Sequence, residues 1–231
     1  MPVYTTIFFD LDHTLWDYET NSRETLMEIF AEHKLLDFGI SGFEAFLQQF
    51  KIVNQKLWHL YDHGKITSEI IRNQRFVQIL EKFNVSDEPL SQKLSEYYLN
   101  VSPKKGNLMP CAVDTLKYLS KNYSLSVITN GFDDVQRTKL QAANITSYFD
   151  HIVTSETAGH KKPAREIFHF ALEANNISAN QAVMIGDNLS TDIAGAKNAS
   201  IDSIFFNPEK IEHKVEVNHE INQLDELCAL L

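Results

Sequence analysis

The sequence predicts an α/β protein, in which a parallel sheet flanked by helices is interrupted by an inserted all-helical segment. From residue 108 onward, short apolar runs alternate with stretches of helical periodicity, the pattern of βαβ units. The run from Thr5 to Phe9 is β-branched or aromatic throughout, so it also predicts a strand. Roughly ninety helical residues follow it, whereas a βαβ crossover needs only about a dozen. The surplus is therefore an insert.

The first strand, Thr5 to Phe9, belongs to a core predicted over residues 1–15 and 106–231. Further strands and helices alternate along that core, and helical periodicity extends to the last residues. The expected strands are Ser124–Thr129, His151–Thr154, Ala182–Ile185 and Ser203–Phe206, and the expected helices are Cys111–Asn122, Asp133–Asn144, Pro163–Asn175, Asp192–Asn198 and Asn222–Leu231.

The insert, predicted over residues 16–105, reads as four helices joined to the core by short hinges. We expect starts at Asn21 or Ser22, at Ser41, at Thr67 or Ser68, and at Leu90. The second helix carries an aromatic and apolar stripe, which is typical of either a bundle core or a binding surface, and we favour the core. The stripe contains Phe43, Phe46, Leu47, Phe50, Val53, Leu57 and Tyr61.

Composition limits the possible functions. The chain has 231 residues, and its 43% hydrophobic content is ordinary for a globular protein with a real core. A net charge of −10 disfavours a nucleic acid polymer or an anionic membrane as partner, whereas a small anionic ligand needs only one positive pocket. No apolar run reaches the length of a membrane span, and nothing resembles a targeting segment. The two cysteines predict free thiols in a reducing compartment, so we expect a cytoplasmic protein with no implied protein partner.

Two carboxylates, Asp10 and Asp12, stand directly after the first strand. An unpaired charge at a buried strand end costs several kcal/mol, so a divalent cation is the simplest compensation. The alternative is that both residues begin an ordinary surface turn, where Asp is common.

Two further strands end in polar residues, Thr129-Asn130-Gly131 and Gly186-Asp187, and Asp192 follows. The first group suits a bound phosphate, or it is a helix cap with a turn glycine. The two aspartates have the alternative of a turn and a first helical turn, which the helix dipole favours. Because the carboxyl ends of parallel strands share one edge of the sheet, all these residues converge there.

The pair Lys161-Lys162 before Pro163 has its own alternative, two solvated lysines ahead of a helix that begins with proline. Each group taken singly fits a structural explanation. The joint order Asp-x-Asp, Thr-Asn, Lys-Pro and Gly-Asp at these spacings is a specific signal of a functional site.

In these motifs the chain resembles the haloacid dehalogenase superfamily over its whole length. The matching segments are D-L-D-H-T-L at Asp10–Leu15, T-N at Thr129, K-P at Lys162 and G-D-x-x-x-x-D at Gly186–Asp192. The resemblance implies a Rossmann-like three-layer αβα core, a mobile helical cap formed by the insert, and Mg²⁺-dependent phosphoryl transfer through an aspartyl-phosphate.

The resemblance also implies roles for the motif residues. Asp10 is the nucleophile, and Mg²⁺ is held by Asp10, the Asp12 backbone carbonyl and Asp187. Lys162 is the motif lysine, although Lys161 beside it leaves open whether the two share that role. The phosphate oxygens are bound by Thr129, Asn130, Gly131 and Lys162, while Asp192 orients its neighbours.

Physical chemistry supports those roles independently. A carboxylate that attacks a phosphate is repelled by about 4 kcal/mol at ~4 Å and an effective dielectric near 20, so Mg²⁺ and Lys162 are needed to cancel the repulsion. Asp12 would protonate the leaving oxygen and later activate water. An ordinary Asp has a pKa of about 3.9, so this role requires a raised pKa in the closed site.

Asp12 also separates the branches of the superfamily. The dehalogenase branch lacks an acid at this position, because a halide leaves without a proton, so we expect a phosphatase. His13, where glycine is commonest, makes the segment similar to the pyrimidine 5′-nucleotidase branch, whose members act on nucleoside monophosphates. The alternatives are a phosphoglycolate or sugar phosphate phosphatase, a sugar phosphomutase, and a binding protein without turnover. The last is disfavoured because Asp10, Asp12 and the motif lysine are all present.

The turn after the nucleophile leads into the insert. His13 lies near the cap hinge or is simply tolerated in the turn, while Trp16, Asp17 and Tyr18 line a substrate pocket or pack the hinge. Cys111 and Ser200 occupy positions where the superfamily often has glycine. A positive φ at such a residue costs about 1 kcal/mol.

Overall fold

The computed structural model describes residues 4–231. It divides into two compact units: Glu19–Lys105 forms one, and the residues before Glu19 together with Gly106–Leu231 form the other. The helical unit thus begins a few residues later than the predicted insert. That the two units are separate domains stays a prediction, and each is described by itself.

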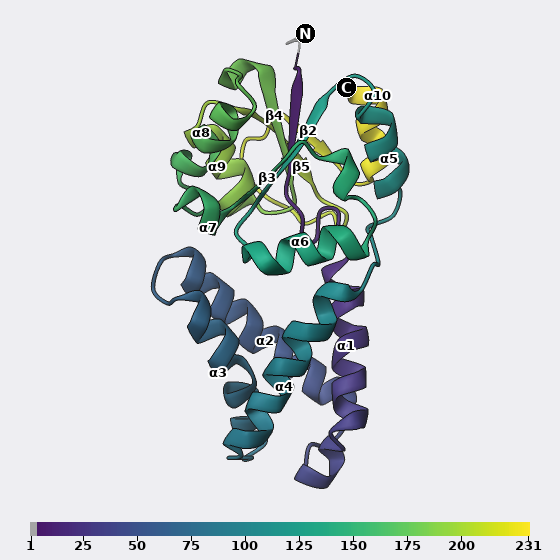
Figure 1. Cartoon of the computed structure of the whole chain (residues 1–231), viewed down its shortest axis with the longest axis vertical. Coiled ribbons are helices and arrows are strands. Elements are labelled where there is room, and N and C mark those ends of the chain that lie inside the picture. The colour runs from purple at the N-terminus through teal and green to yellow at the C-terminus, as the bar shows by residue number, and fades with distance from the viewer. Residues whose placement is uncertain (1–3) are drawn as a thin grey trace. The chain divides into compact units, whose positions relative to one another are not determined.

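The second of these, the α/β unit, is built on a six-stranded parallel sheet with helices on both faces (Figure 1). The predicted fold class is confirmed. The strand order is β3-β2-β1-β4-β5-β6, which places β1 at the centre between β2 and β4. The strands are β1 Thr6–Phe9, β2 Ser124–Thr129, β3 His151–Thr154, β4 Ala182–Gly186, β5 Asp202–Phe206 and β6 His219–Ile221.

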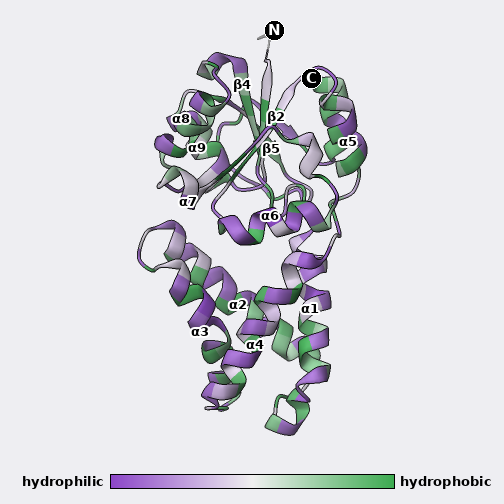
Figure 2. Ribbon diagram, in the orientation of Figure 1, coloured by the Kyte–Doolittle hydropathy of each residue, from purple (hydrophilic) through white to green (hydrophobic). Residues whose placement is uncertain are grey.

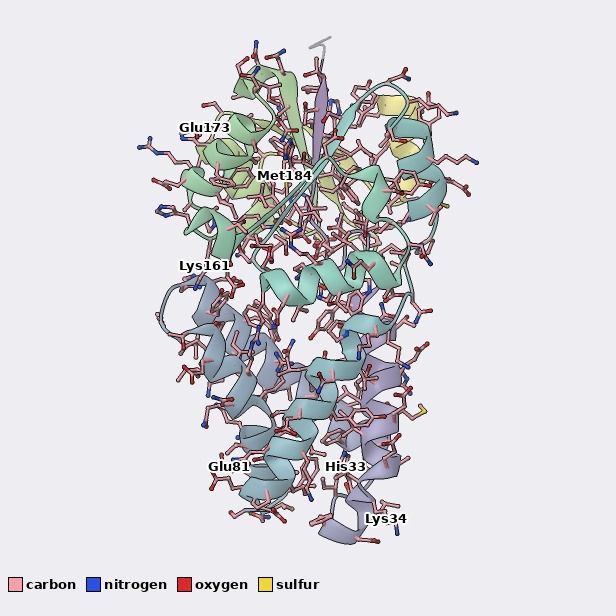
Figure 3. The ribbon with its side chains drawn as sticks, viewed as in Figure 1. His33, Lys34, Glu81, Lys161, Glu173 and Met184 are labelled. Carbon is pink, nitrogen blue, oxygen red and sulfur yellow. The ribbon has the colours of Figure 1, made fainter. Side chains whose placement is uncertain are left out.

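Side chains alternate between the two faces of this sheet, as strand geometry requires. Ile7 and Phe9 of β1 pack into the hydrophobic cluster that includes residues of α5, α6 and α10, whereas Phe8 packs into the cluster of α8 and α9. Because both faces are covered, the central strands β1 and β4 are buried throughout, and Figure 2 shows hydrophobic colours along β4 and β5. Met184 of β4, labelled in Figure 3, is fully buried in the middle of the sheet.

The helices of the α/β unit lie close to the predicted ranges. The segment before α9 is a π-helical turn, Leu189–Ile193, so the predicted helix at Asp192 starts within an irregular turn. The short α7 was not predicted. The helices are α5 Ala112–Leu119, α6 Asp133–Ala142, α7 Ser155–Ala158, α8 Arg165–Ala174, α9 Ala194–Asn198 and α10 Leu227–Leu230.

The C-terminal region differs most from the sequence-based expectation. A continuous helix over Asn222–Leu231 is wrong, since α10 is a single turn preceded by a 3₁₀ turn at Leu224–Glu226. The missed strand β6 has only three residues, two of them exposed, so it carries no alternating apolar pattern. It is held by parallel pairing with β5, a long-range contact that local sequence does not encode.

The helical unit contains the four expected helices. The predicted start of the first at Asn21 or Ser22 is wrong, because α1 begins at Tyr18 and both side chains are buried. The Ser22 hydroxyl is not a cap but lies 2.8 Å from the Tyr98 hydroxyl of α4. The helices are α1 Tyr18–Glu32, α2 Phe43–Asp62, α3 Ser68–Glu81 and α4 Glu88–Val101.

The aromatic stripe of α2 forms the core of this unit, as predicted, and only Phe43 is partly exposed. Phe50 lies with its ring centroid 6.1 Å from Phe76 of α3 and 5.1 Å from Tyr98. The guanidinium of the buried Arg75 stacks over the rings of Phe50 and Tyr98. Among residues 4–231, no helix has both the length and the apolar character needed to cross a membrane.

Three residues predicted at glycine-like positions adopt left-handed backbone conformations. The φ angles are 64° at His13, 64° at Cys111 and 57° at Ser200. Cys111 directly precedes α5, and Ser200 lies two residues after the end of α9. Only glycine takes this conformation without a steric penalty. The chain therefore carries local strain of about 1 kcal/mol at each position.

Replacing Ser200 by glycine is expected to raise the free energy of unfolding by about 0.5–1 kcal/mol, because it relieves the left-handed strain at an exposed site. Chemical denaturation measures the change. The matched control is Ser120→Gly, an exposed serine after α5 with φ of −63°, where glycine is expected to destabilise. Equal effects of the two substitutions would contradict the assignment of strain to Ser200.

Candidate active site

Three adjacent strands carry the predicted residues to one edge of the sheet. Phe9, the last residue of β1, pairs with Val127 of β2 and with Ile185 of β4. Asp10 directly follows β1, and its backbone N–H donates to the Ile185 carbonyl at 2.9 Å. Thr129 ends β2 in the same way. The topology therefore brings together residues that lie far apart in the sequence, as expected for open parallel sheets.

Lys162 provides a buried ammonium at the centre of this edge, with 2% exposure. It forms an ion pair with Asp10 and another with Asp192 at 2.8 Å, and it donates to the Ile128 carbonyl at 2.8 Å. Burial lowers the pKa of this ammonium, but the carboxylates of Asp10 and Asp192 more than offset the effect and leave it raised. Lys162 is therefore charged.

Asn130 holds the backbone of Lys162 in place. The amide of Asn130 donates to the Lys162 carbonyl at 3.0 Å and accepts from the Lys162 N–H at 2.7 Å. Its side chain thus positions the backbone of the motif lysine. The neighbouring Lys161, labelled in Figure 3, is partly exposed, whereas Lys162 is the lysine that contacts the carboxylates.

Three carboxylates converge on the same point. Asp10, Asp187 and Asp192 each offer an oxygen within 4.8 Å of the other two. The Asp187 carboxylate also accepts from the buried Thr14 hydroxyl at 3.1 Å. Three acids against the single ammonium of Lys162 leave an excess of negative charge, and an all-oxygen donor set is the one that Mg²⁺ and Ca²⁺ prefer. The residues present therefore fit a divalent cation.

The pKa values of Asp187 and Asp10 are both raised, in agreement with this excess of negative charge. Burial raises the pKa of Asp187 to about 6, and the carboxylate of Asp192 adds to the effect. Burial also raises the pKa of Asp10 well above its ordinary value; Lys162 opposes this, while Asp192 and Asp187 add to it. A cation among these oxygens would relieve the repulsion.

Asp192 is close-packed against the end of β4. Its Oδ2 accepts from the Asn188 N–H at 3.0 Å, and its Oδ1 contacts Lys162. A Cβ at Gly186 would lie 2.3 Å from that Oδ2, so only glycine lets the carboxylate approach the strand. The Gly-Asp motif thus sets where the second aspartate can sit.

Asp12 is bound apart from the other carboxylates by two residues of α6. Its Oδ1 lies 2.5 Å from the Lys139 ammonium, and its Oδ2 accepts from the Gln136 amide at 2.9 Å. Burial would raise the pKa of Asp12, but Lys139 and the hydrogen bond from Gln136 outweigh it and leave the pKa lowered. The sequence-based expectation of a raised pKa is thus not met in this structure, because Lys139 and Gln136 stabilise the charged form of Asp12.

Thr129 and Gly131 form the turn between β2 and α6. The Thr129 hydroxyl oxygen accepts from the Gly131 N–H at 3.0 Å, so the hydroxyl proton remains available for a ligand. Thr129 is 2% exposed. Gly131 has no room for a side chain, since a Cβ would lie 1.5 Å from the Gln136 amide nitrogen.

Lys139 and Gln136 are site residues that sequence reasoning missed. Their position in the predicted helix was the one indication in the sequence. Gln136 and Lys139 lie on the same helix face as the apolar Leu140, which is four residues after Gln136. Polar side chains on an apolar helix face need buried partners. Trp16, predicted as either pocket lining or hinge packing, is fully buried beneath Lys139, which fits packing.

The fold and site together define a class of protein: an α/β enzyme whose acidic, lysine-centred site lies at the carboxyl edge of a parallel sheet. A family model described as haloacid dehalogenase-like hydrolase matches residues 7–206. The chain belongs to this family of hydrolases.

Individual relatives agree with this assignment. The chain is 35% identical to the pyrimidine 5′-nucleotidase YjjG of Escherichia coli, over 96% of this chain and 97% of that protein. It is 28% identical to the pyrimidine 5′-nucleotidase PynA of Streptococcus pneumoniae, over 99% and 95%. Among solved structures, the magnesium-bound putative hydrolase YfnB of Bacillus subtilis is similar at a TM-score of 0.88 with 28% identity, over 99% and 98% of the two chains.

The raised pKa of Asp187 predicts a pH-dependent stability of the metal-free protein. The native state holds this proton more tightly than the unfolded chain, so the free energy of unfolding falls as pH rises from about 4 to about 6. The Asp187→Asn variant has no carboxyl group to ionise at this position. We therefore expect its free energy of unfolding to fall by about 1–3 kcal/mol less than that of the wild type over the same pH range. Denaturation at pH 4.5 and 7.5 in a chelator measures it. A wild-type minus variant difference that is constant with pH would contradict the assignment.

Proposed function

We propose that the protein is a Mg²⁺-dependent phosphomonoesterase that forms an aspartyl-phosphate on Asp10 and acts best on nucleoside 5′-monophosphates. The observation that carries the proposal is the pairing of two carboxylates in different surroundings. Asp10 faces the ammonium of Lys162, while Asp12 lies apart with its own partners on α6. One carboxylate can attack phosphorus while the other serves the leaving group.

The residues around Asp10 suit a phosphate dianion. The ammonium of Lys162 offsets the repulsion between the Asp10 carboxylate and the phosphoryl oxygens, about 4 kcal/mol at ~4 Å in a medium of effective dielectric near 20. The Thr129 hydroxyl, whose oxygen accepts from the Gly131 N–H, can donate its own proton to the same oxygens. Asn130 contributes by fixing Lys162.

The cation would be held by Asp10, Asp187 and the backbone carbonyl of Asp12. Both oxygens of Asp192 are already engaged, by Lys162 and by the Asn188 N–H, so Asp192 is assigned to orientation. When bound, the metal supplies Lewis-acid stabilisation of the phosphoryl oxygens and neutralises the excess negative charge.

The chemistry proceeds in two steps. An Asp10 oxygen forms a bond to phosphorus as the bond to the ester oxygen breaks, and Asp12 gives its proton to that oxygen. This role requires that substrate binding raise the pKa of Asp12 from its lowered value in the free site, so that Asp12 enters the step protonated. Asp12 then takes a proton from water as the water oxygen attacks the phosphorus of the aspartyl-phosphate, which releases phosphate and restores the Asp10 carboxylate. Protons and bonds therefore balance over the cycle.

Two lines support a nucleoside monophosphate as the substrate. The segment around His13 is similar to that of the pyrimidine 5′-nucleotidase branch, and two relatives that align over nearly the whole chain carry that name. The helical unit is assigned as the cap by its place in the chain, directly after the turn that bears Asp10 and Asp12. Phosphoglycolate, sugar phosphates and phosphomutase activity are the alternatives that a substrate panel has to separate.

A phosphate-ester panel tests the reaction class. With Mg²⁺ at several pH values, we expect phosphate release from pyrimidine nucleoside 5′-monophosphates at a higher kcat/KM than from phosphoglycolate or sugar phosphates. Chelation of the metal is expected to abolish it. Preference for a sugar phosphate would overturn the substrate assignment alone. Turnover of a 2-haloacid without turnover of any ester would overturn the phosphatase assignment.

Asp10→Asn tests the covalent mechanism. Loss of the nucleophile is expected to lower kcat by at least ~10³-fold, because no other group can form the intermediate. The matched control is Asp114→Asn on the exposed surface of α5, which removes an equal charge and should retain activity. Substantial turnover by Asp10→Asn, with its fold intact by circular dichroism, would refute the aspartyl-phosphate.

A further inference from the structure

Both oxygens of the Asp12 carboxylate are held by neighbouring turns of one helix. Lys139 lies 2.5 Å from Oδ1 and Gln136 lies 2.9 Å from Oδ2, and the two donors are three residues apart on α6. Spacing of three residues puts side chains on the same face of a helix. A carboxylate that accepts a hydrogen bond at each oxygen is held in one orientation, whereas a single hydrogen bond would let it rotate.

The hydrogen bond from Gln136 to Asp12 leaves the other end of the Gln136 amide without a partner in the described part of the chain. Its Oε1 is buried without a hydrogen-bond partner among residues 4–231. Rotating the amide by half a turn would instead set that oxygen against the Asp12 carboxylate, so the amide N–H faces the acid and the acceptor goes unsatisfied. An unsatisfied buried acceptor costs about 1–3 kcal/mol. Gly131 makes the space, since any Cβ there would overlap the Gln136 amide.

Lys139 is fixed from its other side by the turn that carries Asp12. Its ammonium lies 4.4 Å from the ring of Trp16 and 5.9 Å from the ring of Tyr18. Trp16 is fully buried, and its backbone N–H donates to the Leu11 carbonyl at 2.8 Å, which closes the turn around Asp12. Lys139 is 5% exposed. Its ammonium therefore lies against two aromatic rings and pairs with the carboxylate of Asp12.

Lys139 and Gln136 are also connected through the chain to the proposed phosphate site. The helix α6 starts at Asp133, directly after the turn of Thr129 and Gly131 that ends β2. One short segment thus carries the hydroxyl that faces the phosphate and the side chains that aim Asp12. Their relative position is set by a single rigid helix, the kind of support that fixes a reacting group to within a fraction of an ångström.

We propose that Lys139 and Gln136 are positioning residues that aim the Asp12 carboxyl group at the leaving oxygen. The inference rests on the proposed function, because it concerns the group that protonates the ester oxygen. In this role Lys139 and Gln136 act through Asp12, which both of them contact, and not on the phosphate or the metal. Their contribution is confined to leaving groups that need a proton, whereas the attack by Asp10 does not depend on them.

The test compares two esters through kcat/KM, which reports only the steps up to formation of the aspartyl-phosphate. Uridine 5′-monophosphate releases an alkoxide that needs a proton, whereas p-nitrophenyl phosphate releases a stable phenolate. For Lys139→Met we expect kcat/KM on the nucleotide to fall ~10²-fold and on the aryl ester less than ~5-fold. Lys139→Arg, which keeps the charge and the ring contact, is expected to restore much of the nucleotide activity.

Arg137→Met is the matched control, because Arg137 is an exposed cation of the same helix that pairs with Asp133. It should leave both rates unchanged. An equal loss on both esters in Lys139→Met would overturn the proposal and assign the ion pair a structural role, as would an unchanged nucleotide rate. If Lys139→Met fails to fold, Gln136→Leu is used instead, and its loss of kcat/KM on the nucleotide is compared with its loss on the aryl ester. Wild-type protein inactive on both esters would defeat the proposed function instead.

Discussion

The ion pair between Lys162 and the carboxylates of Asp10 and Asp192 is the interaction on which this site depends. Burying three acids at one sheet edge is costly, and a single ammonium compensates only part of it. The rest of the local architecture serves to hold that arrangement. Asn130 holds the lysine backbone, and Gly186 leaves room for Asp192. The excess of negative charge attracts a cation, and only with that cation bound can the site accept an anionic phosphate.

Much of this could be predicted from the sequence because it follows from topology. Once strands are recognised as parallel, their carboxyl ends must share an edge, so Asp10, Thr129 and Asp187 are neighbours whatever the details of packing. The left-handed backbone at Cys111 and Ser200 was expected only from the resemblance, because both residues stand where the superfamily often has glycine.

What could not be predicted depends on contacts between segments with no local signature. The ion pair of Lys139 with Asp12 joins residues 127 positions apart, and a lysine in a helix reads as a solvated side chain until its face is known. Asn130 stays a predicted phosphate ligand, and its two hydrogen bonds to the backbone of Lys162 are contacts that no local pattern indicated. The strand β6 and the early start of α1 are likewise set by partners rather than by propensity.

The base of the insert has a consequence for folding. The backbone N–H of Asp17 donates to the Asn107 carbonyl at 3.1 Å, and Trp16 pairs with Leu108, so the two chain crossings are pinned side by side. The central strand β1 cannot pair with β2 until this long segment has closed, at an entropic cost of about 4 kcal/mol for a flexible loop of that length. If the helical unit first folds around its own aromatic core, fewer flexible residues remain between β1 and β2, and the entropic cost of bringing these strands together falls. Early folding of the helical unit would then accelerate assembly of the sheet, and mutations in its core would slow the folding of a site they never touch.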